Sequence, residues 1–208
     1  MKIQNVVVYL ASSFPKDKVY EEAVVSTGEY LARNGLTLVY GGSNEGTMKT
    51  LADTVLANGG KAIGVFTSGL PARMRRTDLT ECHETETLAE RKAKMLELAD
   101  VVVALPGSFG TWDELFDALA ISKMNSLFHD GPIPIGLINV NGFYDKLLEF
   151  INASIEAGIT PRSCRNLLKS APTIDELMRQ FNSGLWTVDC GLWTVDCGLW
   201  TVKKLGIR

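Results

Sequence analysis

The 208-residue sequence has few metal-ligating side chains, with two histidines and four cysteines, and it has no long apolar run. No cysteines form a C-x-x-C pair, and His83 and His129 have no partners at ligand spacing. We therefore expect no metal site and cysteines that stay reduced. No apolar stretch approaches the roughly 20 residues of a membrane span. The first apolar run, residues 6–10, is too short for a signal sequence, so we expect a cytoplasmic protein without membrane contact.

An excess of positive charge is absent as well. The chain has 21 Lys and Arg against 24 Asp and Glu, which gives a net charge of −3. This balance argues against nonspecific binding of nucleic acid. The length and the 46% hydrophobic content are sufficient for one domain with a real core, or for one domain with a small appendage.

Apolar runs of strand length alternate with stretches of helical period. The expected strands are Gln4–Leu10, Leu36–Tyr40, Ala62–Phe66, Val101–Leu105 and Ile133–Ile138. The expected helices are Lys16–Arg33, Met48–Asn58, Leu88–Ala99, Thr111–Ile121, Phe143–Ala157 and Thr173–Phe181. This alternation predicts a doubly wound, Rossmann-like α/β fold, with a parallel sheet, helices on both faces, and ligands at the carboxyl ends of the strands.

The sequence changes character after Phe181. A seven-residue unit beginning at Gly184 repeats from Gly191 and again, in part, from Gly198. We therefore divide the chain into a nucleotide-binding domain, residues 1–182, and a repetitive extension, residues 183–208. The glycine in each unit argues against a coiled coil, and the alternation within a unit suits short strands. A perfect repeat is also what a sequence artefact produces, and both interpretations stay open here.

Two glycine-rich turns follow expected strands at the same edge of the sheet. They read G-G-S-N-E-G-T at residues 41–47 and P-G-S-F-G-T at residues 106–111. Helix N-termini at such turns favour anions. Neither turn carries the G-x-G-x-x-G fingerprint, and Thr47 and Met48 stand where a P-loop needs lysine and serine or threonine. The turns predict phosphate binding without ATPase chemistry; the alternative is a pair of flexible connections.

One arginine lies on an apolar face of its predicted helix. Leu88, Arg91, Met95 and Leu98 share a stripe at helical spacing. A guanidinium there needs a carboxylate or phosphate partner, unless it reaches past the core edge into water. The neighbouring Lys92 is expected on the solvated face of that helix.

Glu114 has a local alternative to a chemical role. Thr111 and Glu114 have the T-x-x-E spacing of a helix capping box, and this spacing alone favours a cap over catalysis. Ser12, just after the first strand, has a similar ambiguity, because its hydroxyl suits either a phosphate or a turn cap.

Residues 1–181 resemble the Lonely Guy family, the cytokinin riboside 5′-monophosphate phosphoribohydrolases formerly labelled lysine decarboxylases. The family motif P-G-G-x-G-T-x-x-E appears as P-G-S-F-G-T-W-D-E at residues 106–114, and R-K-x-x-M is intact at residues 91–95. The first turn, usually G-G-G-x-x-G-L-M-G, reads G-G-S-N-E-G-T-M-K at residues 41–49, so Ser43, Thr47, Lys49 and Ser108 depart from the pattern. These departures bear on the substrate more than on the fold.

The resemblance implies a homodimer that, without a cofactor, hydrolyses the N-glycosidic bond of a purine nucleoside 5′-monophosphate, of the AMP or cytokinin type. The products would be free base and ribose 5-phosphate. It implies Arg91 and Glu114 as the catalytic residues. The implied substrate- and phosphate-binding residues are Ser12, Gly41, Gly42, Gly46, Arg91, Lys92, Gly107, Ser108, Gly110 and Thr111. The alternative is a non-catalytic nucleotide or molybdenum-cofactor carrier of the same fold.

Overall fold

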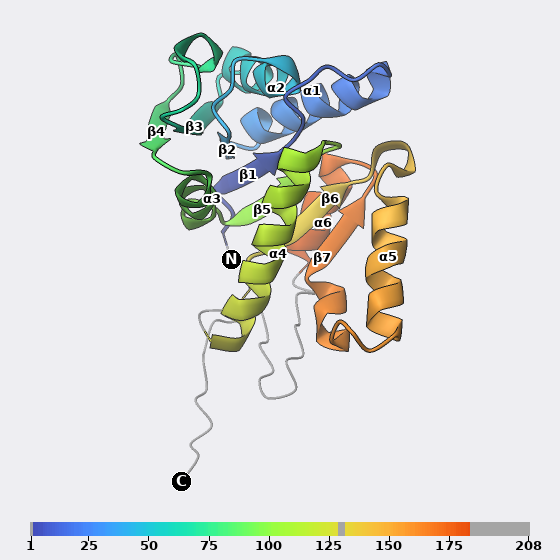
Figure 1. Cartoon of the computed structure of the whole chain (residues 1–208). Helices are drawn as coiled ribbons and strands as arrows, with labels where there is room; N and C mark the ends of the chain where they lie inside the picture. Colours follow the sequence, from blue (N-terminus) through green and yellow to red (C-terminus); the bar gives the residue numbers. More distant parts are fainter. Residues whose placement is uncertain (1, 129–131, 184–208) are drawn as a thin grey trace.

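The computed structural model describes residues 2–128 and 132–183, and Figure 1 shows a single sheet with helices packed on it. His129 and the repeat that begins at Gly184 lie outside the described residues. The strands are β1 (Asn5–Tyr9), β2 (Thr37–Tyr40), β3 (Lys61–Thr67), β4 (Glu81–Thr85), β5 (Val101–Ala104), β6 (Ile135–Ile138) and β7 (Leu168–Ala171). The helices are α1 (Lys18–Arg33), α2 (Gly46–Ala57), α3 (Leu88–Glu97), α4 (Phe109–Phe128), α5 (Asp145–Glu156) and α6 (Ile174–Asn182). Short 3-10 turns are η1 (Ala72–Met74), η2 (Val140–Gly142) and η3 (Arg162–Asn166).

The sheet is parallel throughout its described strands, in the order β4-β3-β2-β1-β5-β6-β7. The chain builds outward from β1 in one direction through β4 and then returns to add β5, β6 and β7 on the other side. The predicted doubly wound α/β fold is therefore confirmed. The direction of winding changes between β1 and β5, which is where ligands bind in sheets of this class.

Two apolar cores, one on each face, hold the sheet between the helices. In β1, Val6 and Val8 face α1, α2 and α6, whereas Val7 and Tyr9 face α3, α4 and the Tyr144 region. This alternation follows from the two-residue period of a strand. Because both faces of the sheet are buried, its central strands are continuous apolar runs in the sequence.

The sequence did not predict two of the strands, β4 and β7. β4 reads E-C-H-E-T and is largely exposed at the sheet edge, while β7 reads L-K-S-A at the other edge. Edge strands need less apolar surface than central ones, so their sequences carry little of the expected pattern. None of the helices in the described ranges is both long and apolar enough to cross a bilayer. Cys82 and Cys164 are free thiols.

Candidate functional site

Three loops reach the carboxyl edge of the sheet at the point where its winding reverses. They follow β1, β2 and β5, which are neighbours in the sheet. All the implied binding residues lie on these loops or on the first turns of the helices that follow them, except Arg91 and Lys92 on α3. The sheet therefore brings segments far apart in sequence to one edge.

The loop after β1 crosses the beginning of α2. Gly46, the first residue of α2, has φ +54°, and a Cβ there would collide with the backbone of Ser12. The next residue, Thr47, is buried and donates its hydroxyl hydrogen to the carbonyl of Ala11 at 2.5 Å. Glycine at position 46 and threonine at position 47 thus fix the place of Ser12 over the N-terminus of α2. Thr47 departs from the family leucine, and its hydrogen bond supplies a reason for that residue here.

The turn after β2 makes room for the arginine of α3. A Cβ on Gly41 would collide with a terminal guanidinium nitrogen of Arg91. Gly42 has φ +66°, and a Cβ there would lie 2.9 Å from the ring of Phe66. The absence of a side chain at these two positions leaves room for the guanidinium of Arg91 and the ring of Phe66.

Arg91 is fixed by hydrogen bonds to two other elements. Its Nε donates to the carbonyl of Val65 in β3 at 2.9 Å, and its Nη1 donates to Oε1 of Glu114 in α4 at 2.9 Å. Its side chain is 15% exposed, so the charge lies at the edge of the core rather than in water. The carboxylate partner that was predicted for Arg91 is therefore Glu114. The stripe itself is only partly buried, since Leu88 at its start is exposed.

Glu114 is a buried carboxylate with a cation as its partner. Its side chain is only 7% exposed, and that burial raises the pKa of the carboxyl, although the charge and hydrogen bond of Arg91 oppose the rise. The capping-box prediction for Thr111 and Glu114 is wrong. The helix begins at Phe109, two residues before Thr111, and Glu114 bonds to Arg91 instead. A capping box does occur in the chain, at Thr87 and Glu90 at the start of α3.

The turn after β5 is packed against its own helix. A Cβ on Gly107 would collide with the hydroxyl of Thr111, which is buried. Ser108 accepts a hydrogen bond at its carbonyl from the N–H of Trp112, at 2.9 Å, and so begins the helical pattern. A Cβ on Gly110 would meet open space among the described residues. Ser108 is exposed, so serine in place of the family glycine at this position is compatible with the turn.

Lys92 does not lie on a solvated face, contrary to the residue-based prediction. Its side chain is 16% exposed, and its ammonium lies 3.0 Å from a carboxylate oxygen of Asp113 and 3.7 Å from one of Asp117. The sequence could have indicated this pair of acids, because Asp113 and Asp117 are four apart and share one face of α4.

Two tyrosines near the site were not predicted. The hydroxyl of Tyr9, at the end of β1, is buried and has no hydrogen-bond partner among the described residues. Burial and the nearby charge of Glu114 raise its pKa, so the phenol is neutral. Tyr144 donates its hydroxyl hydrogen to the carbonyl of Leu105 at 2.7 Å and so anchors the end of β5. A polar aromatic residue at the end of a buried strand was the available signal for Tyr9.

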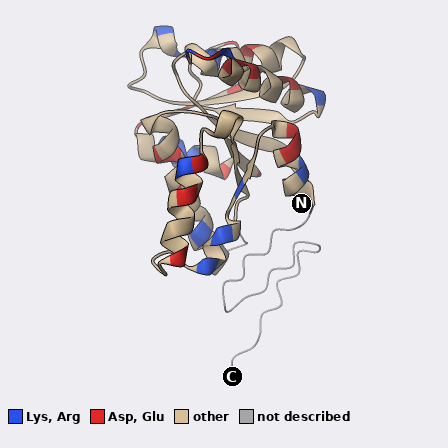
Figure 2. Cartoon of the chain, turned by 90° about the vertical axis from the view of Figure 1, so that its right-hand side faces the viewer, with Lys and Arg blue, Asp and Glu red and all other residues tan. Residues whose placement is uncertain are grey.

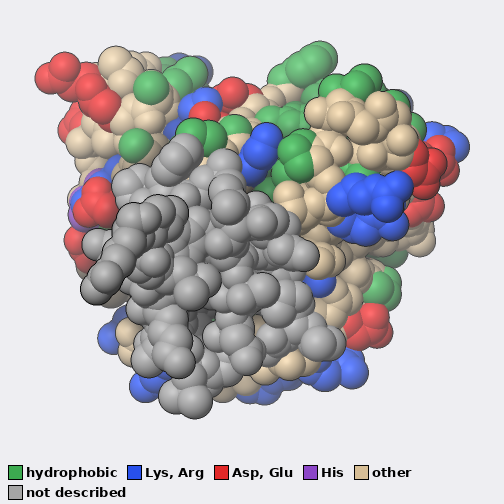
Figure 3. Space-filling view, turned by 90° about the horizontal axis from the view of Figure 1, so that it is seen from below, with side chains coloured by type: hydrophobic (Ala, Val, Ile, Leu, Met, Phe, Trp, Pro, Cys, Tyr) green, Lys and Arg blue, Asp and Glu red, His purple; other side chains and the backbone are tan. Residues whose placement is uncertain are grey.

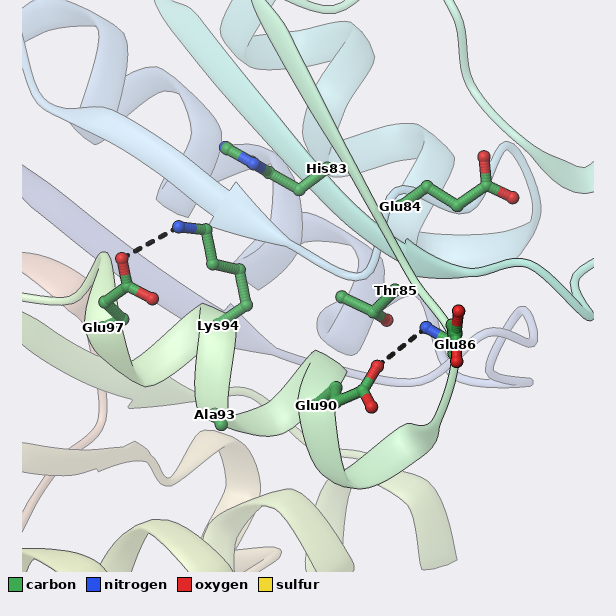
Figure 4. Close-up of a pocket in the computed structure, with 8 residues that line it drawn as sticks. All are labelled: His83, Glu84, Thr85, Glu86, Glu90, Ala93, Lys94 and Glu97. Carbon is green, nitrogen blue, oxygen red and sulfur yellow. Dashed lines mark hydrogen bonds and ion pairs between the residues drawn. The ribbon is translucent and has the colours of Figure 1, made fainter.

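A hollow in the surface is lined by other residues of α3 and by β4. Figure 4 shows it between β4 and α3, lined by His83, Glu84, Thr85, Glu86, Glu90, Ala93, Lys94 and Glu97. No residue of this lining is among the implied site residues. Within the described residues, no group of three or more His, Cys, Asp and Glu side chains is arranged to hold a metal ion.

Basic residues do not gather on one face of the described part of the chain (Figure 2). Acidic and basic residues are interspersed along the helices in Figure 2, and side chains of both kinds appear around the edge of the face seen in Figure 3. This mixture agrees with the small net charge of the sequence, −3.

Comparison with known proteins identifies relatives of the chain. The family model described as "Possible lysine decarboxylase" matches residues 48–181. The cytokinin riboside 5′-monophosphate phosphoribohydrolase LOG of Oryza sativa subsp. japonica is 34% identical over 178 residues, which cover 85% of this chain and 72% of that protein. The phosphoribohydrolase LOG3 of Arabidopsis thaliana is 33% identical over 180 residues, covering 86% of this chain and 82% of that protein.

Solved structures with the same fold include proteins that bind a cofactor. The molybdenum cofactor binding protein of Rippkaea orientalis superposes with a TM-score of 0.65 at 19% identity, over 88% of this chain and 98% of that one. The Moco carrier protein of Chlamydomonas reinhardtii gives a TM-score of 0.62 at 18% identity, over 87% and 96%. At these identities the likeness concerns the fold alone. The family model and the plant relatives decide the membership: the chain belongs to the Lonely Guy family, whose model carries the older description of a possible lysine decarboxylase.

Proposed function

We propose that this chain hydrolyses the N-glycosidic bond of a purine nucleoside 5′-monophosphate, releasing the free base and ribose 5-phosphate. The observation that carries the proposal is the pair of Arg91 and Glu114, a buried carboxylate held at 2.9 Å by a guanidinium beside the turn after β2. Family membership supports it, since the plant relatives carry the name of this activity.

The carboxylate of Glu114 supplies the charge that this reaction needs. Cleavage of the bond between C1′ and the base nitrogen develops positive charge on the ribose, and a carboxylate near C1′ stabilises it. The same carboxylate accepts a proton from the attacking water while the oxygen of that water bonds to C1′. The electron pair of the broken bond goes to the base nitrogen, which takes up a proton from solvent, and Glu114 releases to solvent the proton it accepted from water.

Arg91 gives that carboxylate its orientation. Two of its nitrogens are committed, one to Val65 and one to Glu114, and the remaining terminal nitrogen lies against Gly41. In the proposed complex that nitrogen donates to the phosphate or ribose at the turn after β2. A guanidinium suits this task because its donors lie in one rigid plane.

The phosphate would be held mainly by backbone N–H groups at the starts of α2 and α4. Among the described residues, no side chain caps the first turn of α2, where Glu45 holds the N-cap position. Uncapped N–H groups and the helix dipole together attract an anion. The proposed binding residues are Ser12, Gly41, Gly42, Gly46, Gly107, Ser108, Gly110 and Thr111. All of them lie in residues 1–182, so we propose that this domain carries the reaction without residues 183–208.

An exposed apolar stripe on α4 supports a homodimer. Phe109 is 82% exposed and Phe116 is 46% exposed, and Trp112 and Met124 are exposed on the same helix. Contiguous exposed apolar side chains of this kind mark interfaces more often than free surface. Because Glu114 lies on the same helix, a partner copy seated on this stripe would lie close to the site.

The direct test is release of base from a panel of nucleoside 5′-monophosphates, plain and N6-prenylated, followed by chromatography. We expect release from at least one purine monophosphate, and comparison of AMP with its N6-prenylated form identifies the preferred base. Tight binding of a nucleotide without release of any base would instead favour a carrier of the kind named for the structural neighbours. Ser43, Thr47, Lys49 and Ser108 are the positions to exchange for family residues if the preference differs from that of the plant relatives.

A further inference from the structure

Two charged bridges join α3 to α4 side by side. Arg91 pairs with Glu114 at 2.9 Å, and the next residue, Lys92, pairs with Asp113 at 3.0 Å and with Asp117 at 3.7 Å. We propose that Lys92, acting through Asp113 and Asp117, is a positioning residue that keeps the Glu114 carboxylate ionised and seated on Arg91. The catalytic consequence of this inference rests on the proposed function, whereas the effect of Lys92 on the charge of Glu114 is a property of the folded protein alone.

The geometry of the second bridge suits this role. The Lys92 ammonium has three donors, and two acids one helical turn apart give it two acceptors on the same face of α4. Its side chain is 16% exposed, and its hydrogen bond to Asp113 raises its pKa, so it is charged throughout the neutral range. The bridge spans the same two helices as the pair of Arg91 and Glu114, and it begins at the adjacent residue on each helix.

Electrostatics link the two bridges. The groups that act on Glu114 are Arg91 and Lys92 from α3 and Asp113 from α4; the phenol of Tyr9, from β1, lies near it and is neutral. Arg91 and Lys92 lower the pKa of Glu114, whereas burial and the negative charge of Asp113 raise it. Removal of the Lys92 charge therefore raises the pKa of Glu114, because the opposing effects of burial and of Asp113 remain. It takes away a positive charge, and it leaves Asp113 without its counter-ion.

The competing role for Lys92 is direct contact with the substrate phosphate, as the family resemblance implied. The two roles differ in what they change. A phosphate ligand governs KM and the preference for a phosphorylated substrate. A residue that acts through Asp113 governs the pH at which Glu114 becomes protonated. Substitution of Asp113 separates them, because it removes the acid and leaves the ammonium in place.

The test compares pH profiles of kcat/KM for the full-length protein and three variants. The acidic limb of a profile is the fall in kcat/KM towards low pH. We expect Lys92→Met to move the midpoint of this limb upward by about 0.5 pH unit and Asp113→Asn to move it downward by a smaller amount. The midpoint of the double variant should lie between those of the two single variants. Lys94→Met is the matched control, because Lys94 lies on the same helix but pairs with Glu97, at 2.9 Å. Its acidic limb should coincide with that of the unmodified protein.

The same shifts must appear in a measurement that needs no turnover. Carbon-13 titration of the glutamate carboxyls, with the Glu114 signal assigned by its loss in Glu114→Gln, gives the pKa of that group directly. A Glu114 pKa that is unchanged in Lys92→Met overturns the inference, and a raised KM with an unmoved limb shows a phosphate ligand instead. If the unmodified protein releases no base, the proposed function fails, while the carbon-13 titration still decides the role of Lys92.

Discussion

At the scale of single residues, the buried pair of Arg91 and Glu114 sets the clearest expectations. Glu114→Gln keeps the shape of the side chain and a hydrogen-bond acceptor for Arg91, but it removes the negative charge. We expect it to lower the rate of base release by about 100- to 10,000-fold, the usual range for loss of an acid–base group. Chromatography of released base measures the rate, and circular dichroism checks the fold. Turnover close to that of the unmodified protein would remove Glu114 from the mechanism.

Arg91→Ala tests the other half of the pair. It leaves a buried carboxylate without its cation and frees the carbonyl of Val65, so it should cost both stability and catalysis. We expect kcat/KM to fall by about 100-fold or more, which is about 2.7 kcal/mol, and the affinity for nucleotide to fall with it. Steady-state kinetics and calorimetric binding measure the two effects. Normal kinetics combined with a lowered Tm would make the arginine purely structural.

The acidity of Glu114 also predicts a pH dependence. Burial raises the pKa of this carboxyl, so its protonated form persists to a higher pH than that of an exposed glutamate, whose pKa is about 4.3. If the ionised form is the active one, kcat/KM falls as the pH is lowered through the raised pKa. In the profile of the unmodified protein, the fall in kcat/KM towards low pH should therefore have its midpoint above pH 4.3, and a midpoint at or below that value would contradict the assignment.

Part of this residue-level description could be predicted from the sequence. An arginine on an apolar stripe demands an anionic partner, and that demand was met by Glu114. The capping box was predicted wrongly, because its T-x-x-E spacing is a local pattern and the competing bond comes from a helix 23 residues away. Lys92 was misplaced for the same reason, since its partners lie on α4 rather than on its own helix.

At the scale of elements, substitutions of two glycines between β2 and α2 should have different effects on activity and on stability. The obstacle to a side chain at position 41 is the tip of a flexible arginine, whereas at position 46 it is the backbone of Ser12. We expect Gly41→Ala to displace the remaining terminal nitrogen of Arg91 and lower kcat/KM, with little change in Tm because the bonds to Val65 and Glu114 are kept. Gly46→Ala should destabilise the protein by about 1–2 kcal/mol, since its φ of +54° also disfavours a side chain.

Thermal unfolding and kinetics of the same variants check this expectation. Gly69→Ala is the control, because a Cβ at that position meets nothing within 4 Å among the described residues and the position lies outside the proposed site. If Gly41→Ala retains full activity, the close approach of Arg91 to this turn has no functional meaning.

The starts of α2 and α4 predict a requirement for the 5′-phosphate. One or two charge-assisted hydrogen bonds are worth about 1.5–3 kcal/mol each. Adenosine should therefore have a kcat/KM about 100-fold or more below that of AMP. Parallel assays with the two substrates measure the ratio, and equal values would show that these helix starts do not hold a phosphate.

The central elements were predicted from sequence and the edge elements were not. β1 and β5 are apolar on both faces, and their residues match the expected strands to within two positions. β4 and β7 lie at the edges, where pairing on one side suffices and charged residues are tolerated. Helix α4 extends to Phe128, beyond the predicted end at Ile121, and its buried residue Ser122 donates its hydroxyl hydrogen to the carbonyl of Ile133. The local sequence pattern of apolar residues does not indicate that contact.

At the scale of the whole molecule, the apolar stripe on α4 predicts the oligomeric state. We expect a dimer at micromolar concentration by light scattering coupled to size-exclusion chromatography. Phe116→Glu should shift the mass to that of one chain, because it places a charge in an interface of apolar side chains. Phe150→Glu is the matched control, since Phe150 is also an exposed aromatic residue but lies on α5. A monomeric unmodified protein would contradict the expectation, as would dissociation by the control alone.

The position of β1 in the middle of the sheet has a consequence for the order in which the chain acquires its site during synthesis. A nascent chain that has emerged through α3 holds Ser12, Gly41, Gly46 and Arg91, yet β5 has not been made and one edge of β1 is still unpaired. Glu114 arrives only with α4, more than halfway along the chain. Until then Arg91 is a cation at the rim of an incomplete sheet, so the chemistry of the site begins only once both sides of β1 are covered.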